Sequence, residues 1–326
     1  MQPLNIAIVG LGKQGKEHLD TLLKLEKRGR VKLSGLCDID EAVIERELGN
    51  LRTPKYKNYK DLLNIESIDL LIVSVPNSSH KEIVKFAIKK GVHVLKEKPL
   101  AFNLLDANEL MNLSSKNGRK LYLVQQRAYH KLFLKLKQML SVAGDIKSYY
   151  YKFVLNDNEN TWRKNAKIAG GGVWLNMGWH ACFLLNWFLG KPDKVSLIFN
   201  QKNKYWPYDT EYSATAYFKQ VNSNIKIKTI LDCTARSKEE KLEIVTERFS
   251  IELTRDSLSV KSLASGKVER FTASPSWDDP YYFQLLDVLK KIDSDKEINS
   301  KINLDTMKCI ESGIVSEKCG KWVDIK

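Results

Sequence analysis

Hydrophobic and polar residues follow one pattern up to about residue 122 and a different one after it. In the first part, short apolar segments typical of buried parallel strands alternate with segments whose apolar residues recur at helical spacing. The strands expected there are 5–9, 31–37, 70–75, 92–95 and 120–125. The helices expected there are 16–27, 41–48, 81–90 and 104–115. This alternation predicts an α/β fold with a parallel sheet.

After about residue 122, apolar and polar residues alternate with a period of two. Such segments are typical of antiparallel strands with one face exposed to solvent. They are 148–155, 214–218, 225–231 and 248–253, and they are accompanied by expected helices at 179–189 and 281–291. A chain of 326 residues is long enough for two domains. We therefore predict an α/β domain over residues 1–122 and an α+β domain over residues 123–326.

The composition is that of a globular protein, with 43% hydrophobic and 28% charged residues. No apolar run approaches the ~20 residues that span a bilayer, and the segment before the first strand is too short for a secretion signal. The five cysteines are scattered along the chain and form no C-x-x-C pair. We therefore expect a cytoplasmic protein with reduced thiols, no membrane segment and no metal site.

The net charge of +14 is compatible with a protein that binds nucleic acid. The lysines are spread along the chain in mixed stretches such as 238–241, however, and no basic arm or known nucleic-acid-binding module is present. We interpret the charge as a solvated, lysine-rich surface and expect no nucleic-acid partner. Such a surface would attract an anionic cofactor or substrate.

A glycine-rich segment follows the first expected strand directly and leads into the first expected helix. It reads Gly10-Leu11-Gly12-Lys13-Gln14-Gly15. In a dinucleotide-binding turn, the first glycine permits the tight turn, the second lets the backbone approach a pyrophosphate, and the third lets helix and strand pack closely. The helix N-terminus then presents N–H groups and a favourable dipole to the phosphates. The segment predicts a Rossmann dinucleotide-binding domain over residues 1–122, with Lys13 and Gln14 beside the cofactor.

An acidic residue ends the second expected strand. Asp38 lies 23 residues after Gly15, where a carboxylate accepts hydrogen bonds from the ribose hydroxyls of a dinucleotide. A carboxylate there would repel the 2′-phosphate of NADP, and no arginine follows it closely. The sequence therefore favours NAD as the cofactor over NADP.

Two further segments follow expected strands of the same domain, at the edge where open α/β sheets bind ligands. The first runs from Ser74 through Pro76 and Asn77 to His80, and the second reads Lys96-Glu97-Lys98-Pro99. Proline disfavours a helical backbone at the residue before it, so Lys98 is expected to be extended, with its ammonium group directed into the ligand site. Lys96 fits a plain surface position.

The second domain contains a glycine run, Gly170-Gly171-Gly172, preceded by Trp162 and Arg163. A run of glycines indicates close approach of the backbone to a ligand or to a neighbouring segment. Beyond it, Asn176 and His180 are four residues apart and would share one face of a helix. Arg163 could bind phosphate or carboxylate oxygens and Trp162 could stack on a sugar or base, or both could simply pack against the glycine run.

Taken together, these motifs resemble the Gfo/Idh/MocA family, named for glucose–fructose oxidoreductase, inositol dehydrogenase and a rhizopine-catabolism protein. The resemblance extends over nearly the whole chain. The motifs are Gly10-x-Gly12-x-x-Gly15-x-x-His18, Asp38, Pro76-Asn77-x-x-His80, Gly91-x-His93-Val94-Leu95-x-Glu97-Lys98-Pro99, and Gly170-Gly171-Gly172 leading to His180, Trp187 and Gly190.

The resemblance implies a Rossmann domain followed by a domain with a large open sheet, which acts on polyols, sugars or sugar nucleotides. It implies that Lys98 and His180 are the catalytic pair. We further expect Gln126 to contact the cofactor and Arg127 to contact the substrate. The open sheet implies a homodimer or homotetramer.

The chain departs from the family pattern at two positions near His180. Asn176 lies four residues before the histidine, where the family usually has an acid. Phe183 lies three residues after the histidine, where the family usually has another acid. Asparagine at the first position is similar to the branch that oxidises the 3-hydroxyl of UDP-N-acetylglucosaminuronate, whereas Phe183 differs from that branch.

Oxidation of a secondary alcohol needs a base for the proton and a partner for the developing alkoxide. An imidazole titrates near neutrality, so His180 can take and return the proton, and Lys98 can stabilise the alkoxide. The sequence thus favours an NAD-dependent dehydrogenase of sugars or nucleotide sugars. The alternative is a non-catalytic sensor or scaffold that binds nicotinamide without turnover.

Overall fold

The structure, a computed structural model, describes residues 3–49, 51–157, 162–200, 210–221, 223–274, 278–292 and 300–326. The chain divides into two units. Unit 1 comprises Met1–Ala101, Leu105–Tyr129 and Trp277–Ser300, and unit 2 comprises Phe102–Leu104, His130–Ser276 and Lys301–Lys326. A single division between residues 122 and 123 does not describe this arrangement, because a segment from late in the chain belongs to unit 1.

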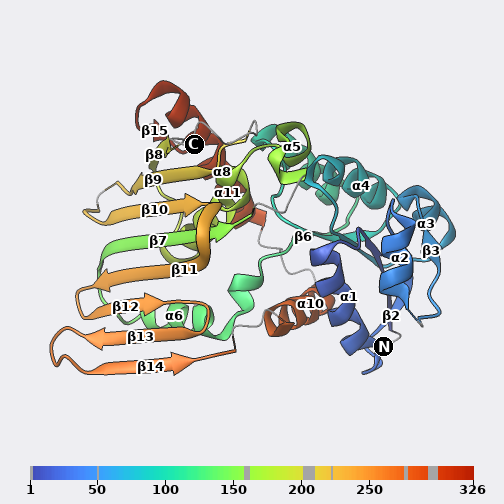
Figure 1. Cartoon of the computed structure of the whole chain (residues 1–326), viewed down its shortest axis with the longest axis horizontal. Helices are drawn as coiled ribbons and strands as arrows, with labels where there is room; N and C mark the ends of the chain where they lie inside the picture. The colour runs from blue at the N-terminus through green and yellow to red at the C-terminus, as the bar shows by residue number, and fades with distance from the viewer. Residues whose placement is uncertain are drawn as a thin grey trace. The chain divides into compact units, whose positions relative to one another are not determined.

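Unit 1 is built on a six-stranded parallel sheet with strand order β3-β2-β1-β4-β5-β6 (Figure 1). Its strands are β1 (Leu4–Val9), β2 (Val31–Cys37), β3 (Lys55–Tyr56), β4 (Leu70–Val73), β5 (His93–Lys96) and β6 (Leu121–Leu123). The predicted parallel sheet is confirmed. Consecutive strands run outward in opposite directions from β1 and β4, so the carboxyl ends of these two strands lie at the topological switch point where such sheets bind ligands.

Helices follow the strands of unit 1 along the chain. They are α1 (Lys13–Glu26), α2 (Glu41–Leu48), α3 (Tyr59–Ile65), α4 (Asn77–Lys89), α5 (Leu104–Lys116) and the 3-10 turn η1 (Gln126–Tyr129). Two helices begin earlier than the apolar spacing predicts, α1 by three residues and α4 by four. The first turn of each helix consists mainly of polar or glycine residues, which carry no apolar periodicity. Gly12 precedes α1 and Pro76 precedes α4, each as the N-cap residue.

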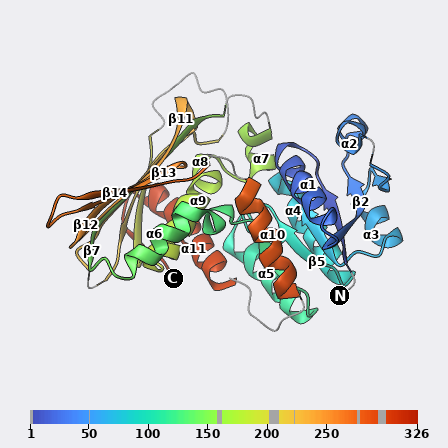
Figure 2. The same ribbon diagram turned by 90° about the horizontal axis from the view of Figure 1, so that it is seen from below.

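The helix α10 (Asp278–Ile292) also belongs to unit 1, although the sequence placed it in the second domain. Tyr281, Leu285, Val288 and Ile292 form its buried face and share one core with the leucines of α1. Figure 2 shows α10 beside α1. Each fully buried leucine-sized side chain contributes about 1.5–3 kcal/mol, so this face fixes α10 on unit 1.

Unit 2 contains a nine-stranded sheet with order β14-β13-β12-β11-β7-β10-β9-β8-β15. Its strands are β7 (Ile146–Asn156), β8 (Lys194–Phe199), β9 (Ser213–Lys219), β10 (Lys226–Asp232), β11 (Thr234–Thr246), β12 (Phe249–Leu253), β13 (Ser257–Ser262), β14 (Val268–Thr272) and β15 (Val323–Asp324). Neighbouring strands are antiparallel except β7 and β10, which pair in parallel. The predicted mostly antiparallel sheet is confirmed.

Helices cover one face of this sheet, as Figure 2 shows for α6, α9 and α11. The helical segments of unit 2 are α6 (Lys131–Leu140), η2 (Trp162–Lys164), α7 (Ala166–Ala169), α8 (Val173–Asn176), α9 (Gly178–Leu189) and α11 (Ser300–Cys319). On the covered face of β7, the alternating residues Tyr149, Tyr151 and Phe153 are buried. None of the described helices combines the length and the apolar composition needed to cross a membrane.

Candidate functional site

The turn between β1 and α1 requires glycine at two positions for reasons of packing. Gly10 has a φ of 91°, and a Cβ atom there would lie 2.2 Å from Ser74 O. A Cβ atom on Gly15 would lie 2.0 Å from Gly10 O. The Gly10 N–H donates to Cys37 O at 2.8 Å, which ties the turn to the end of β2. The turn is therefore held against the carboxyl ends of β1, β2 and β4.

Gly12 is different, because the protein itself does not require glycine there. Its φ of −64° suits any residue, and a Cβ atom would meet no protein atom within 4 Å. It is the N-cap of α1, without a side-chain cap, and the first turn of α1 carries no acidic residue. The open space beside Gly12 and the uncapped N-terminus of α1 fit the pyrophosphate of a dinucleotide.

Asp38 follows β2 and lies beside this turn. Its Oδ2 accepts the Leu11 N–H at 2.7 Å, and its Oδ1 accepts the Asp40 N–H at 3.0 Å. The carboxylate therefore holds the glycine turn in place. Each carboxylate oxygen can accept more than one hydrogen bond, so Asp38 can also receive ribose hydroxyls.

The segment after β4 passes directly from Ser74 into α4, with Pro76 at its N-cap and Asn77 in its first turn. His80, in the same turn, is buried, and its Nε2 lies 2.8 Å from Val75 O. Burial lowers the pKa of His80 well below its usual value, and the charge of Lys96 acts in the same direction. The ring is therefore neutral at physiological pH. A carbonyl only accepts, so Nε2 carries the hydrogen and Nδ1 is an acceptor.

Lys96, at the end of β5, is completely buried, so its interpretation as a surface lysine is wrong. Its Nζ donates to Pro99 O at 2.6 Å and to Leu100 O at 2.7 Å. Burial lowers its pKa to about 7. Lys96 therefore holds the turn that carries Lys98, which is half-buried and joined to Pro99 by a cis peptide bond.

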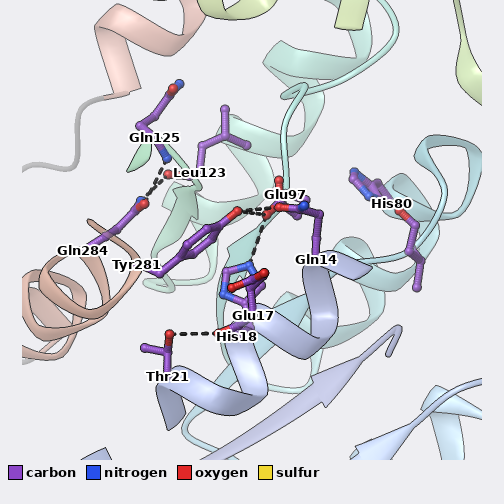
Figure 3. A network of polar contacts seen from close by, with 11 residues as sticks. Gln14, Glu17, His18, Thr21, His80, Glu97, Leu123, Gln125, Tyr281 and Gln284 are labelled. Atoms are coloured by element: carbon purple, nitrogen blue, oxygen red, sulfur yellow. Dashed lines mark hydrogen bonds and ion pairs between the residues drawn. The ribbon is translucent and has the colours of Figure 1, made fainter. Parts of the chain in front are cut away.

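Glu97 is the centre of a buried network of polar contacts (Figure 3). Its Oε1 lies 3.1 Å from His18 Nε2 and 3.4 Å from the hydroxyl of Tyr281. The same hydroxyl donates to Gln14 Oε1 at 2.5 Å. Burial acts to raise the pKa of Glu97, but the hydrogen bond and charge of His18, together with Lys98, outweigh it and lower the pKa. The network joins α1, the segment after β5, and α10.

Tyr281 is a member of this network that the sequence did not identify as a site residue. Its helical spacing with Leu285 and Val288 predicts a helix but does not indicate which core the helix joins. A second residue of α10, Gln284, accepts the Gln125 N–H at 3.0 Å and donates to Leu123 O at 2.8 Å (Figure 3). These contacts join α10 to the end of β6.

The expected ligand residues after β6 lie in η1. Arg127 is buried, and Gln126 is half-buried. The Oε1 atom of Gln126 is buried without a hydrogen-bond partner. An unsatisfied buried acceptor costs about 1–3 kcal/mol, and a donor from a ligand would remove that cost. Gln126 therefore fits the predicted cofactor contact.

In unit 2, the glycine run packs against neighbouring protein. A Cβ atom on Gly170, whose φ is 79°, would lie 2.2 Å from the Phe102 ring. A Cβ atom on Gly172 would lie 2.0 Å from Glu211 O. Of the two alternatives, a ligand or a neighbouring segment, the neighbour accounts for both glycines.

Glu211 is a half-buried acid that the sequence did not identify. Its Oε1 accepts the Trp174 N–H at 3.1 Å, at the start of α8. Burial raises the pKa of Glu211, partly offset by hydrogen bonds from backbone N–H groups. It fixes the segment that leads from the glycine run towards His180.

His180 is buried in the first turn of α9. Asn176 ends α8, and Met177 between the two helices has helical dihedral angles. The ring of His180 lies 6.2 Å from that of Phe153. Phe183, where the family has an acid, is buried and stacks on Trp187 with ring centroids 6.3 Å apart. Phe183 therefore packs in the core of unit 2.

Trp162 and Arg163 contact each other in η2. The guanidinium of Arg163 lies 5.0 Å from the centre of the Trp162 ring, and its Nη1 lies 3.3 Å from Asp157 Oδ1. A phosphate at Arg163 would therefore share the guanidinium with Asp157. Among the residues that the structure describes, no cluster of three or more His, Cys, Asp or Glu side chains could hold a metal ion.

Two family models match the chain in succession. Residues 4–125 match the model described as an oxidoreductase family with an NAD-binding Rossmann fold, and residues 133–258 match the GFO/IDH/MocA C-terminal domain. An inositol 2-dehydrogenase/D-chiro-inositol 3-dehydrogenase of Lactiplantibacillus plantarum is 30% identical over 138 residues, which are 41% of this chain and 39% of that protein. The match thus spans about two fifths of this curated relative.

Solved structures share the fold over the whole chain. Levoglucosan dehydrogenase, in complex with NADH and L-sorbose, has a TM-score of 0.90 at 15% identity and covers 100% of both chains. The WlbA dehydrogenase of Chromobacterium violaceum, in complex with NADH and UDP-GlcNAcA, has a TM-score of 0.84 at 19% identity and covers 99% of this chain and 96% of its own. With both halves matched in order, the chain belongs to the GFO/IDH/MocA family of oxidoreductases, with an N-terminal NAD-binding Rossmann domain.

Proposed function

We propose that this protein is an NAD-dependent dehydrogenase that oxidises a secondary hydroxyl of a sugar or nucleotide sugar, or reduces the corresponding ketone. The observation that carries the proposal is the glycine turn of unit 1. Gly12 is a glycine that the protein's own packing does not require, at an uncapped helix N-terminus beside the carboxylate of Asp38. Lys98 lies in the same unit, after β5.

The residues of unit 1 would hold the cofactor in distinct ways. The backbone at Gly12 and the N-terminus of α1 bind the pyrophosphate, and Asp38 binds the ribose. The carboxylate of Asp38 disfavours the 2′-phosphate of NADP. When bound, NAD accepts the hydride from the reacting carbon of the substrate.

His180 handles the proton and Lys98 stabilises the charge on the substrate oxygen. Oxidation breaks the C–H bond, whose electron pair leaves with the hydride, and the O–H bond, whose proton passes to His180. Lys98 donates a hydrogen bond to the substrate oxygen and stabilises its developing negative charge. In the reverse direction His180 returns the proton and Lys98 polarises the ketone.

The relatives and the charge of the chain support the proposed substrate class. The relatives reported above are dehydrogenases of inositol and levoglucosan, and one solved structure contains UDP-GlcNAcA. The net charge of +14 and the Arg163–Trp162 pair support a substrate with a phosphate or nucleotide group. We therefore propose a nucleotide-linked or phosphorylated sugar rather than a free polyol.

A substrate panel tests this proposal. Purified protein is incubated with NAD and UDP-linked sugars, inositol or free hexoses, and NADH formation is followed spectroscopically. We expect turnover of a UDP-linked sugar. Efficient turnover of a free polyol, with UDP-sugars neither reacting nor competing, would contradict the nucleotide-sugar assignment. NADH binding without turnover of any sugar would instead support a sensor or scaffold.

A further inference from the structure

We propose that Tyr281 positions the glycine turn through Gln14, so that α10 is part of the NAD site. This inference rests on the proposed function and names a residue that acts on cofactor binding through another side chain. Tyr281 comes from a segment that follows all the motifs of the site by about 100 residues.

A side chain of α10 donates a hydrogen bond to a side chain at the start of α1. The Tyr281 hydroxyl donates to Gln14 Oε1 at 2.5 Å, and Gln14 is the second residue of α1, immediately after the uncapped N-terminus (Figure 3). A hydroxyl has a single hydrogen, and the carboxylate of Glu97 is farther away, at 3.4 Å. The main bond is therefore to Gln14, with Glu97 as a second acceptor.

This bond also orients the amide of Gln14. Because its Oε1 accepts from Tyr281, its NH₂ group points the other way and remains a donor. Lys13 and Gln14 are the first two residues of α1. A fixed NH₂ group there can donate to an anionic ligand without first losing its rotational freedom.

The hydroxyl is the part of Tyr281 that makes this contact. Its ring packs edge-on against His18, with centroids 4.9 Å apart and planes at 86°, and it belongs to the apolar core of unit 1. Burial and the charge of Glu97 raise the pKa of Tyr281 well above its usual value, so the hydroxyl keeps its proton. Tyr281→Phe therefore removes the hydrogen bond and leaves the ring packing.

Tyr129, in η1, offers a matched control because its hydroxyl contacts the same helix, α10. The Tyr129 hydroxyl donates to Asp287 Oδ2 at 2.5 Å and thereby also ties α10 to unit 1, but it has no bond to Gln14 or Glu97. Each replacement by phenylalanine removes a hydroxyl that joins α10 to another segment of unit 1. Any difference in cofactor binding between the two variants then reports on the glycine turn.

The experiment is a titration with NADH, followed by fluorescence, of the full-length wild type, Tyr281→Phe, Tyr129→Phe, Gln14→Ala and the Tyr281→Phe/Gln14→Ala double variant. Loss of one buried hydrogen bond corresponds to about a 3- to 10-fold change in dissociation constant. We expect Tyr281→Phe to weaken NADH binding by this factor, and Tyr129→Phe to change it less than about 2-fold.

The double variant separates positioning from general stability. If Tyr281 acts through Gln14, Tyr281→Phe has little further effect once Gln14 is alanine. An undiminished effect in that background, or equal weakening by Tyr129→Phe, would overturn the proposal. A wild type that binds no NADH at all would overturn the proposed function, and this inference with it.

Discussion

Replacement of the buried lysine Lys96 by methionine should change the pH dependence of stability. Methionine has a similar length and flexibility but cannot be charged or donate a hydrogen bond. In the folded protein the pKa of Lys96 is lowered from 10.5 to about 7 by burial. The unfolded chain therefore binds a proton between these two pH values that the folded protein does not bind.

The direction and size of the change in stability with pH follow from this difference in bound protons. Where the unfolded state binds more protons, stability rises with pH, so the wild type gains stability from about pH 7 up to about pH 10.5. The difference of 3.5 pH units corresponds to at most ~5 kcal/mol. The methionine variant lacks this gain, and it also loses the two hydrogen bonds to Pro99 O and Leu100 O, at about 1 kcal/mol each.

We therefore expect Lys96→Met to be less stable than the wild type at about pH 10 and to match or exceed it at about pH 7. Urea denaturation followed by circular dichroism, at several pH values in this range, measures the difference. Burial and the charge of Lys96 hold the pKa of His80 well below its usual value, so this histidine does not titrate within the range. Lys89→Met, at an exposed position of α4, is the control. A stability difference that stays constant with pH would refute the reasoning.

Two further predictions concern the glycine turn. Gly10→Ala should destabilise unit 1 by ~2 kcal/mol or more, because Gly10 has a positive φ and a Cβ atom there would collide with Ser74 O. Gly12→Ala should leave the thermal unfolding temperature nearly unchanged and weaken NADH binding instead. Equal losses of stability in the two variants would contradict the role of Gly12. The wild type should bind NADH more tightly than NADPH, and Asp38→Asn should reduce that preference in paired titrations; tighter binding of NADPH by the wild type would contradict the role of Asp38.

The sequence predicted much of unit 1 because its signals are local. The strand at 31–37 and the helix at 41–48 were predicted with their exact bounds, since apolar spacing and a terminal glycine are read directly from neighbouring residues. The glycine turn was predicted for the same reason. The starts of α1 and α4 were missed because helix-starting turns at a glycine or proline contain few apolar residues.

Other features depend on contacts that form only in the folded chain. The apolar face of α10 is visible in the sequence, but its packing on α1 is not, because either unit could bury it. Lys96 resembles a surface lysine until the Pro99 and Leu100 carbonyls that receive its ammonium group are placed in space. Glu211, likewise, lies about 40 residues from the helix that it caps. No spacing rule connects such pairs.

The central claim is that the protein transfers a hydride, with His180 as the proton acceptor and Lys98 as the group that stabilises the developing alkoxide. Single-turnover kinetics tests it most directly. The wild type, Lys98→Met, His180→Ala and the control Lys89→Met are compared with NAD and the sugar that the substrate panel identifies, while NADH binding is measured in parallel. We predict that Lys98→Met and His180→Ala each slow hydride transfer by ~10²–10⁴-fold, with NADH binding changed far less and Lys89→Met unaffected. Near wild-type hydride transfer in either His180→Ala or Lys98→Met would contradict the account.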